Sequence, residues 1–149
     1  MDEYRIYFNP NSDGYRLPTE AEWEFAARGG IHSKGYEYSG SNNLQDVSEL
    51  SNILFGYQPV GKKKANELGL YDMSGNLMEW CWDVYDSTNC TVDLVEAKKK
   101  GTAKYDFDRV LRGGAHCYPE KTHRVCYRQK GGYTDSLPFC GFRVARNKM

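Results

Sequence analysis

The sequence predicts an α+β domain in which loops make up much of the chain. One segment has the spacing of an amphipathic helix, several short segments alternate as strands do, and the stretches between them are rich in Gly, Ser and Asn. The chain has 149 residues, enough for one globular domain, so we expect residues 1–149 to form a single unit. A surface with so many loops suits binding or a grafted site.

The helix is predicted over residues 21–28. Thr19 stands at the N-cap position, and Glu22 follows three residues later as its partner in a capping box. Trp23 and the two alanines that follow at helical spacing provide an apolar stripe. The pair Gly29 and Gly30 ends the helix.

Short strands are predicted at five places. A central strand is expected over residues 78–85, where the pattern changes to period two. We expect Trp80 and Trp82, on the apolar side of this strand, to be buried beside the helix that carries Trp23. The other strand predictions are residues 4–8, 109–112, 123–128 and 141–145, whereas residues 31–66 predict loops with little regular structure.

Composition and charge exclude several classes of protein. Twenty basic and twenty acidic side chains cancel, so no net field attracts the chain to nucleic acid or to membrane phosphate. A run of eighteen apolar residues is absent from the sequence, so no membrane-spanning helix is predicted, and the cellular compartment stays open. Twelve tyrosines indicate an amphipathic surface that is suited to recognition.

Three stretches of the chain carry a recognisable signature. They are GYRLPTEAEWEFAARGG at residues 14–30, NELGLYDMSGNLMEWCWD at residues 66–83, and RVLRGG at residues 109–114, which is followed by GFRVAR at residues 141–146. Together they resemble the formylglycine-generating enzyme, or sulfatase-modifying factor, family. The resemblance implies a modified C-type-lectin-like fold with structural calcium. In that family a substantial portion precedes the first motif, so we expect this chain to be N-terminally short, as a truncated or short relative.

The resemblance also implies one calcium site. The family binds calcium through two side chains and two backbone carbonyls, and the matching positions are Asp72, Gly75, Leu77 and Glu79. The alternative is that Asp72 caps a turn and that Glu79 pairs with an arginine. A second family site would fall near Asn52 and Ile53, but its acidic segment is absent from the sequence, so we do not assign it.

The catalytic arrangement of the family is not reproduced. Family members use two cysteines that bind copper(I) to oxidise a sulfatase cysteine to formylglycine, and a serine precedes them. At the three matching positions this chain has Ala115, Tyr118 and His123. Cys117 and Cys126 flank these positions and are candidates for a shifted site. The alternative is that Cys126 is a small buried hydrophobe in a strand and that Cys117 is a loop residue.

A recognition surface is predicted over residues 115–140. This segment carries side chains that are common in binding sites, namely His116, Tyr118, His123, Tyr127, Gln129, Tyr133, Asp135 and Phe139. The arrangement also resembles the variable binding proteins made by diversity-generating retroelements, some of which use the same fold subtype. We expect the histidines to contact a ligand rather than to carry out chemistry.

Two functions from different classes remain open from the sequence. The first is a calcium-stabilised, non-catalytic module that binds a protein or a small molecule. The second is a copper-dependent formylglycine-generating oxidoreductase, or a fragment of one. The five cysteines include no C-x-x-C pair, so neither a zinc site nor a thioredoxin-type motif is indicated.

Overall fold

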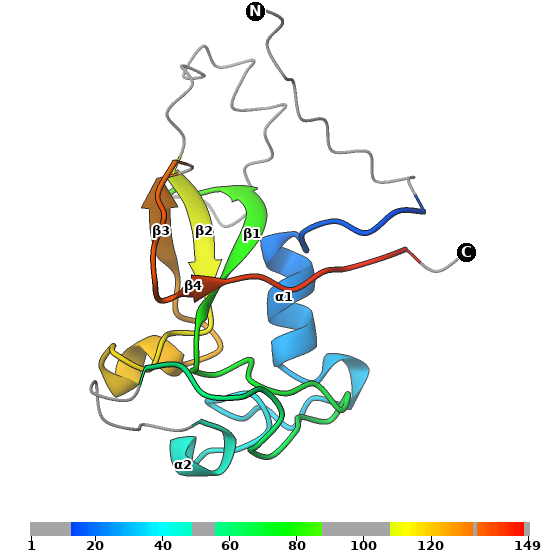
Figure 1. Ribbon diagram of the computed structural model, residues 1–149. Helices are drawn as coiled ribbons and strands as arrows, with labels where there is room; N and C mark the ends of the chain where they lie inside the picture. The colour runs from blue at the N-terminus through cyan, green and yellow to red at the C-terminus, as the bar shows by residue number, and fades with distance from the viewer. Residues whose placement is uncertain (1–12, 49–55, 88–107, 133, 148–149) are drawn as a thin grey trace, which may run out of the picture.

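The computed structural model describes residues 13–48, 56–87, 108–132 and 134–147. In this part of the chain, four strands form one mixed sheet in the order β3-β2-β1-β4. Their bounds are β1 Met78–Val84, β2 Asp108–Arg112, β3 Gln129–Gly132 and β4 Cys140–Gly141. The helix α1, Glu20–Ala27, lies beside the sheet, and long connections gather at one end of the molecule (Figure 1). The predicted loop-rich α+β fold class is confirmed.

The helix α1 begins as the sequence predicts. The hydroxyl of Thr19 accepts a hydrogen bond from the backbone N–H of Glu22, and the Glu22 carboxylate accepts one from the N–H of Thr19 at 2.8 Å. This reciprocal pair satisfies two of the amide groups that a helix start leaves without partners. Gly29 follows the helix with a φ of 89°, a left-handed conformation that favours glycine.

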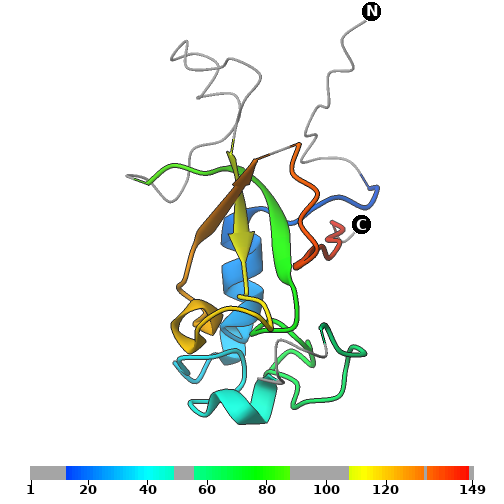
Figure 2. The same cartoon turned by 60° about the vertical axis from the view of Figure 1, so that its left-hand side comes forward.

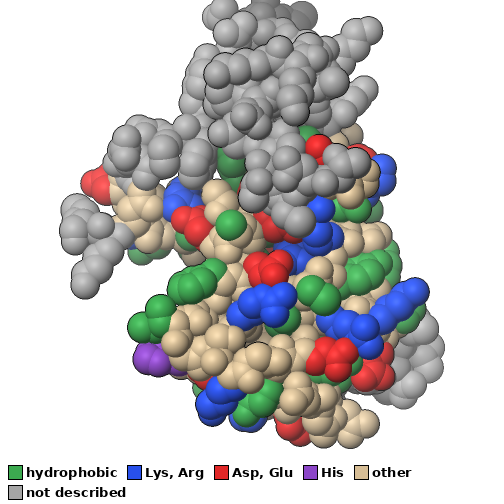
Figure 3. Space-filling view, turned by 180° about the vertical axis from the view of Figure 1, so that it is seen from behind, with side chains coloured by type: hydrophobic (Ala, Val, Ile, Leu, Met, Phe, Trp, Pro, Cys, Tyr) green, Lys and Arg blue, Asp and Glu red, His purple; other side chains and the backbone are tan. Residues whose placement is uncertain are grey.

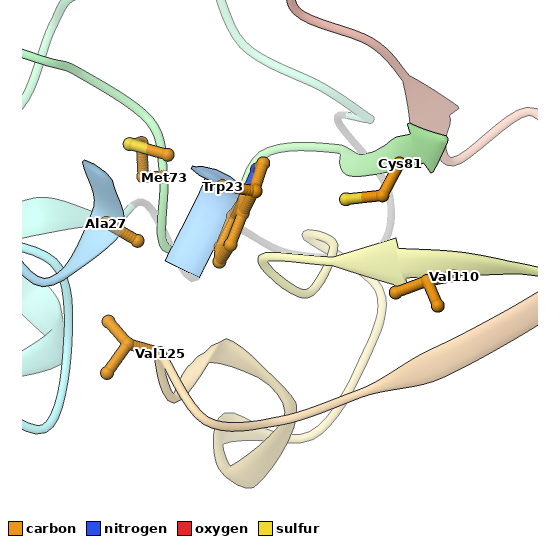
Figure 4. Packing of buried hydrophobic residues seen from close by; sticks show 6 residues of the cluster. All are labelled: Trp23, Ala27, Met73, Cys81, Val110 and Val125. Carbon is orange, nitrogen blue, oxygen red and sulfur yellow. The ribbon is translucent and has the colours of Figure 1, made fainter. Parts of the chain in front are cut away.

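The main core lies between α1 and the sheet. Trp23 and Ala27 of the helix are buried, and they form one cluster with Cys81 of β1 and Val110 of β2 (Figure 4). The predicted facing of β1 is therefore wrong, because Cys81 and not Trp80 or Trp82 packs against the helix. Both tryptophans are only partly buried. The period-two pattern located the strand, but both of its sides are covered by protein, so hydrophobicity did not identify the helix side.

A second cluster covers the opposite face of the sheet. Met78, Leu111 and Ala115 are fully buried there, and Trp80 packs against them. A side chain at Gly131 of β3 would lie 2.7 Å from the Trp80 ring and 2.9 Å from Leu111. Glycine at this position is what lets the Trp80 ring lie over β3.

The strand predicted over residues 123–128 is not formed. Its first residue ends the 3₁₀ helix η2, Glu120–His123, and β3 begins only at Gln129. The buried guanidinium of Arg112 donates to the carbonyl oxygens of Val125 and Tyr127, and the N–H of Val125 donates to the carbonyl of Glu37. These contacts occupy backbone groups that a strand would use for its ladder.

The ends of the described chain meet in a short pairing. The strand predicted over residues 141–145 is reduced to the two-residue β4, which runs parallel to β1, with Met78 opposite Cys140. Ala145 then forms an isolated bridge with Arg16. The strand predicted over residues 4–8, like Asn52 and Ile53, lies outside the described residues.

The loop prediction for residues 31–66 agrees with what the structure describes of them. Only two short helical pieces are present in or at the edge of the described part of this segment, η1 Gly30–His32 and α2 Leu44–Val47. Figure 2 shows α2 and its neighbouring loops below the sheet, with α1 behind the strands. No helix among the described residues is long and apolar enough to span a bilayer.

Candidate functional site

An open pocket of about 410 Å³ lies where the segment before β1 meets the segment after β4. Three of the four residues that the family resemblance marks as calcium ligands line it, namely Asp72, Leu77 and Glu79. Phe142 and Arg143 form the other side. The two segments are far apart in sequence, so the pocket depends on the pairing of β1 with β4.

A tight turn positions the first wall of the pocket. Asp72 and Asn76 both have left-handed backbone conformations, with φ of 58° and 64°. Gly75 between them is buried with a φ of 99°, and a Cβ atom there would lie 1.9 Å from the Ser48 hydroxyl. Only glycine fits this position without a rearrangement. The turn leads from Asp72 to the start of β1, and both Asp72 and Glu79 line the pocket.

The Glu79 carboxylate accepts three hydrogen bonds. Its Oε2 accepts from Nε1 of Trp23 at 2.6 Å and from Nε of Arg143 at 2.5 Å. Its Oε1 accepts from Nη2 of Arg143 at 2.6 Å, which completes a bidentate pair. Burial lowers the pKa of Arg143, but the hydrogen bonds to Glu79 and the charges of Glu79 and Asp72 outweigh it and raise that pKa.

Asp72 caps a different turn, at Val60 and Gly61, which lies earlier in the chain. Its Oδ2 accepts from the backbone N–H of Gly61 at 2.7 Å. Both contacts of the alternative interpretation are therefore present, a turn capped by Asp72 and a Glu79–arginine pair. No group of three or more His, Cys, Asp or Glu side chains with metal-site geometry occurs in the described part of the chain.

The two carboxylates on the pocket wall are the type of donor that a hard cation takes. Two carboxylates and one guanidinium leave one net negative charge on its wall. Calcium takes carboxylate and carbonyl oxygens in flexible geometry and completes its shell with water. Asp72 and Glu79, with the Gly75 and Leu77 carbonyls, are the residues that would hold it.

Tyr118 and His123, which the family resemblance matches to the copper thiolates, are both packed side chains. The Tyr118 ring meets the Phe139 ring edge to face, with centroids 5.2 Å apart. Burial, followed by the neighbouring thiols of Cys117 and Cys140, raises the pKa of Tyr118. His123 has no exposed surface, and its Nδ1 lies 3.3 Å from the Pro119 carbonyl oxygen. Burial lowers the pKa of His123 and keeps the imidazole neutral.

The two cysteine candidates differ in their surroundings. Cys117 is partly buried and packs against the Met78 cluster, as Cys140 does. Burial and the neighbouring Cys117 raise the pKa of Cys140 to about 11. Cys126 is exposed, so its interpretation as a small buried hydrophobe is wrong. That interpretation assumed a strand over residues 123–128, and without the strand the side chain turns to solvent.

Part of the predicted recognition surface comes together on the sheet face opposite α1. Tyr118 and Phe139 pack there beside Trp80, and the Tyr127 hydroxyl lies 3.3 Å from Oε1 of Gln129. We call Trp80, Tyr118, Tyr127, Gln129 and Phe139 the aromatic face.

The other predicted recognition residues lie elsewhere. His116 stands at the Asn76 carbonyl, with Nδ1 3.1 Å from its oxygen, and the exposed Asp135 closes a turn at Gly132. His123 is buried and so does not lie on the exposed surface with the others, and its contact with a ligand stays a prediction. Tyr133 lies outside the described residues.

The sequence did not predict the roles of Trp80 in the aromatic face and of Arg143 in the pocket. Trp80 was assigned to the helix side, and Arg143 was read only as part of the GFRVAR motif. Their roles depend on which strand pairs with which, and a short parallel pair such as β1 with β4 leaves no local signal. The rear view in Figure 3 shows acidic and basic side chains lying beside one another, in keeping with the balanced charge.

The model of the sulfatase-modifying factor enzyme 1-like domain matches residues 2–148. The chain belongs to this family. Among similar proteins, chaperone protein LppX of Paenibacillus barcinonensis is 34% identical over 164 residues, which cover 98% of this chain and 54% of that protein. The formylglycine-generating enzyme of Streptomyces coelicolor is 31% identical over 151 residues, covering 90% and 47%.

Two solved structures are also similar to this chain. Treponema denticola variable protein 1 matches with a TM-score of 0.73 and 32% identity, covering 93% of this chain and 49% of that one. CarF matches with a TM-score of 0.73 and 29% identity, covering 95% and 50%. The family resemblance and the C-type-lectin-like fold are thus confirmed. The chain spans about half the length of these relatives.

Proposed function

We propose that this sulfatase-modifying-factor-like chain is a calcium-stabilised, non-catalytic domain that binds a protein or a small molecule through its aromatic face. The observation that carries the proposal is the filling of the two copper-thiolate positions by Tyr118 and His123. A phenol packed against Phe139 and a buried neutral imidazole do not supply the thiolate pair that copper(I) requires. The side chains at these two matched positions therefore do not fit copper(I).

The aromatic face has the chemistry of a recognition surface. Trp80, Tyr118 and Phe139 are each partly buried, so they offer apolar area while packing holds their rings in place. Rigid aromatic side chains lose little conformational entropy on binding. Gln129 on β3 adds a polar group beside the Tyr127 hydroxyl. This combination suits a partner that presents apolar surface with a few hydrogen-bonding groups.

The two proposed sites are joined through β1. Met78, on which the aromatic residues pack, is next to Glu79 in the pocket, and β4 pairs with both residues. Calcium would supply positive charge that holds Asp72 and Glu79 together, and so it would stabilise the start of β1. The chain's own contribution is to fix the carboxylates with the Gly75 turn and the Trp23 hydrogen bond.

The relatives support the two candidate functions unequally. One matching structure is named a variable protein, which accords with a binding role on this fold. The second candidate is a formylglycine-generating oxidoreductase, and identity of 31% to enzymes of that name supports it. Fold and family do not decide between them, because activity depends on the site.

The deciding test is an activity assay on the whole chain. Purified protein is loaded with copper(I) and given oxygen and a cysteine peptide of the sulfatase type, and aldehyde formation is measured by mass spectrometry. We expect no formylglycine above the level of a protein-free control. Turnover that is lost on Cys117→Ala or Cys126→Ala would establish a shifted thiolate site and overturn the proposal.

A further inference from the structure

The positively charged guanidinium of Arg143 lines the pocket and is hydrogen-bonded to its wall. It donates to both oxygens of Glu79, at 2.5 and 2.6 Å, and its Nη2 also donates to the Tyr71 carbonyl at 3.1 Å. The charge of Asp72 reaches it as well. Arg143 therefore already interacts with both carboxylates that a calcium ion would use.

Counting acceptors at Glu79 shows what remains for a metal. An ionised carboxylate offers about four lone-pair positions on its two oxygens. Trp23 and Arg143 together occupy three of them, two on Oε2 and one on Oε1. One acceptor position on Oε1 is left. Glu79 therefore cannot bind an ion through both oxygens while Arg143 keeps its two hydrogen bonds to the carboxylate.

The net charge of the pocket also indicates weak binding of a metal ion. Two carboxylates alone would give the pocket two negative charges, and Arg143 reduces this to one. Calcium sites of high affinity combine several carboxylates with a bidentate glutamate, and sites with fewer charges bind more weakly. A guanidinium beside the ion also repels it directly.

We infer that Arg143 sets the calcium affinity of this pocket and keeps it low, by competing with the ion for Glu79. The inference rests on the proposed calcium site. The site should fill at calcium concentrations of about 10⁻⁴–10⁻³ M, the range of extracellular modules, rather than at micromolar calcium.

The test is a calcium titration of the wild-type chain and two matched variants. Arg143→Met removes the guanidinium, and Arg146→Met removes an equal charge from an exposed arginine that lies over the Tyr15 ring outside the pocket. Binding is measured by calorimetry and by terbium luminescence excited through Tyr71 on the pocket wall. We expect Arg143→Met to bind calcium at least about tenfold more tightly, because a like charge leaves the site, while Arg146→Met stays near wild type.

Other outcomes separate the inference from the calcium proposal. Equal calcium affinity in all three proteins would overturn the inference and leave the calcium site standing. No calcium or terbium binding by any of them would overturn the calcium proposal and the inference with it. Melting curves in EDTA identify a variant that fails to fold. Arg143→Lys then takes its place, since it keeps the charge but loses the paired hydrogen bonds to the carboxylate, and we expect it to bind calcium with intermediate affinity.

Discussion

Trp23 and Arg143 meet at one oxygen of Glu79. The indole Nε1 of Trp23 donates to Oε2 at 2.6 Å, and Nε of Arg143 donates to the same atom at 2.5 Å. The core helix, the central strand and the segment after β4 are therefore joined at a single carboxylate that is 8% exposed. A buried carboxylate needs such donors to remain charged.

Replacing the Trp23 indole tests this junction. Trp23→Phe keeps a buried aromatic ring but removes the N–H, so Glu79 loses a donor in a buried place. We expect the free energy of unfolding to fall by about 1–3 kcal/mol, the cost of an unsatisfied buried partner together with the smaller ring. Urea denaturation measures it. Phe25→Leu on the exposed side of the same helix is the control, and an equal loss there would contradict the account.

Calcium should stabilise the fold. An ion that binds only the native state raises the melting temperature by mass action, and ten times the dissociation constant adds about 1.4 kcal/mol. We expect millimolar calcium to raise the melting temperature of the wild type, and Asp72→Asn to abolish the rise. Asp13→Asn, an exposed carboxylate outside the pocket, should keep it. An equal rise of the melting temperature in the Asp72→Asn variant would show that calcium binds outside this pocket.

Acid should act through His123. Burial lowers its pKa in the folded state, so the unfolded chain takes up the proton first, near the ordinary histidine pKa of about 6.5. Above pH 6.5, roughly the pKa of an unfolded histidine, His123 is neutral in both states and does not change the free energy of unfolding. Below that pH the unfolded chain binds the proton more readily than the folded chain, so the free energy of unfolding falls as the pH approaches the folded-state pKa. We expect the wild type to lose more stability between pH 7 and pH 5, roughly the histidine range, than His123→Leu does. Parallel curves for the two proteins would refute this, and His32→Asn, at an exposed position, controls for a general effect.

Thiol reactivity should follow burial. Among the four cysteines that the structure describes, exposed Cys126 should react first with an aromatic disulfide reagent. Cys140 should react slowly because its pKa is raised to about 11. Cys81 is fully buried with a raised pKa and should react only on unfolding. Peptide mapping after timed labelling assigns each site. Labelling of Cys81 before Cys126 would show that the strand facing described above is incorrect.

Short-range sequence patterns predicted much of this fold. The capping box of Thr19 and Glu22 placed α1, because it needs only residues three apart in sequence. Period two located β1 within one residue of its end. The face of β1 was not predictable in the same way. Cys81 is small and Trp80 is large, yet the small residue faces the helix, because Trp23 already fills that space.

The rest depends on contacts between distant segments. The stretch after His123 has the alternating pattern of a strand. Buried Arg112 donates hydrogen bonds to two of its carbonyl oxygens, so these groups do not pair with a neighbouring strand. The pocket likewise joins residues near 72–79 to residues near 142, through a pairing of only two residues. The motif gave the carboxylates Asp72 and Glu79, but no spacing rule identifies Arg143 as the partner of Glu79.

The most direct test of the central claim is a copper(I) competition. The chain is mixed with one equivalent of copper(I) and a chromophoric chelator of known strength, and the copper held by each is read from absorbance. A family-type thiolate pair would retain copper against the chelator, whereas Tyr118 and His123 provide no such ligands. We predict that the chelator takes all the copper. Retention of one copper ion per chain, lost on Cys117→Ser or Cys126→Ser, would contradict the non-catalytic account.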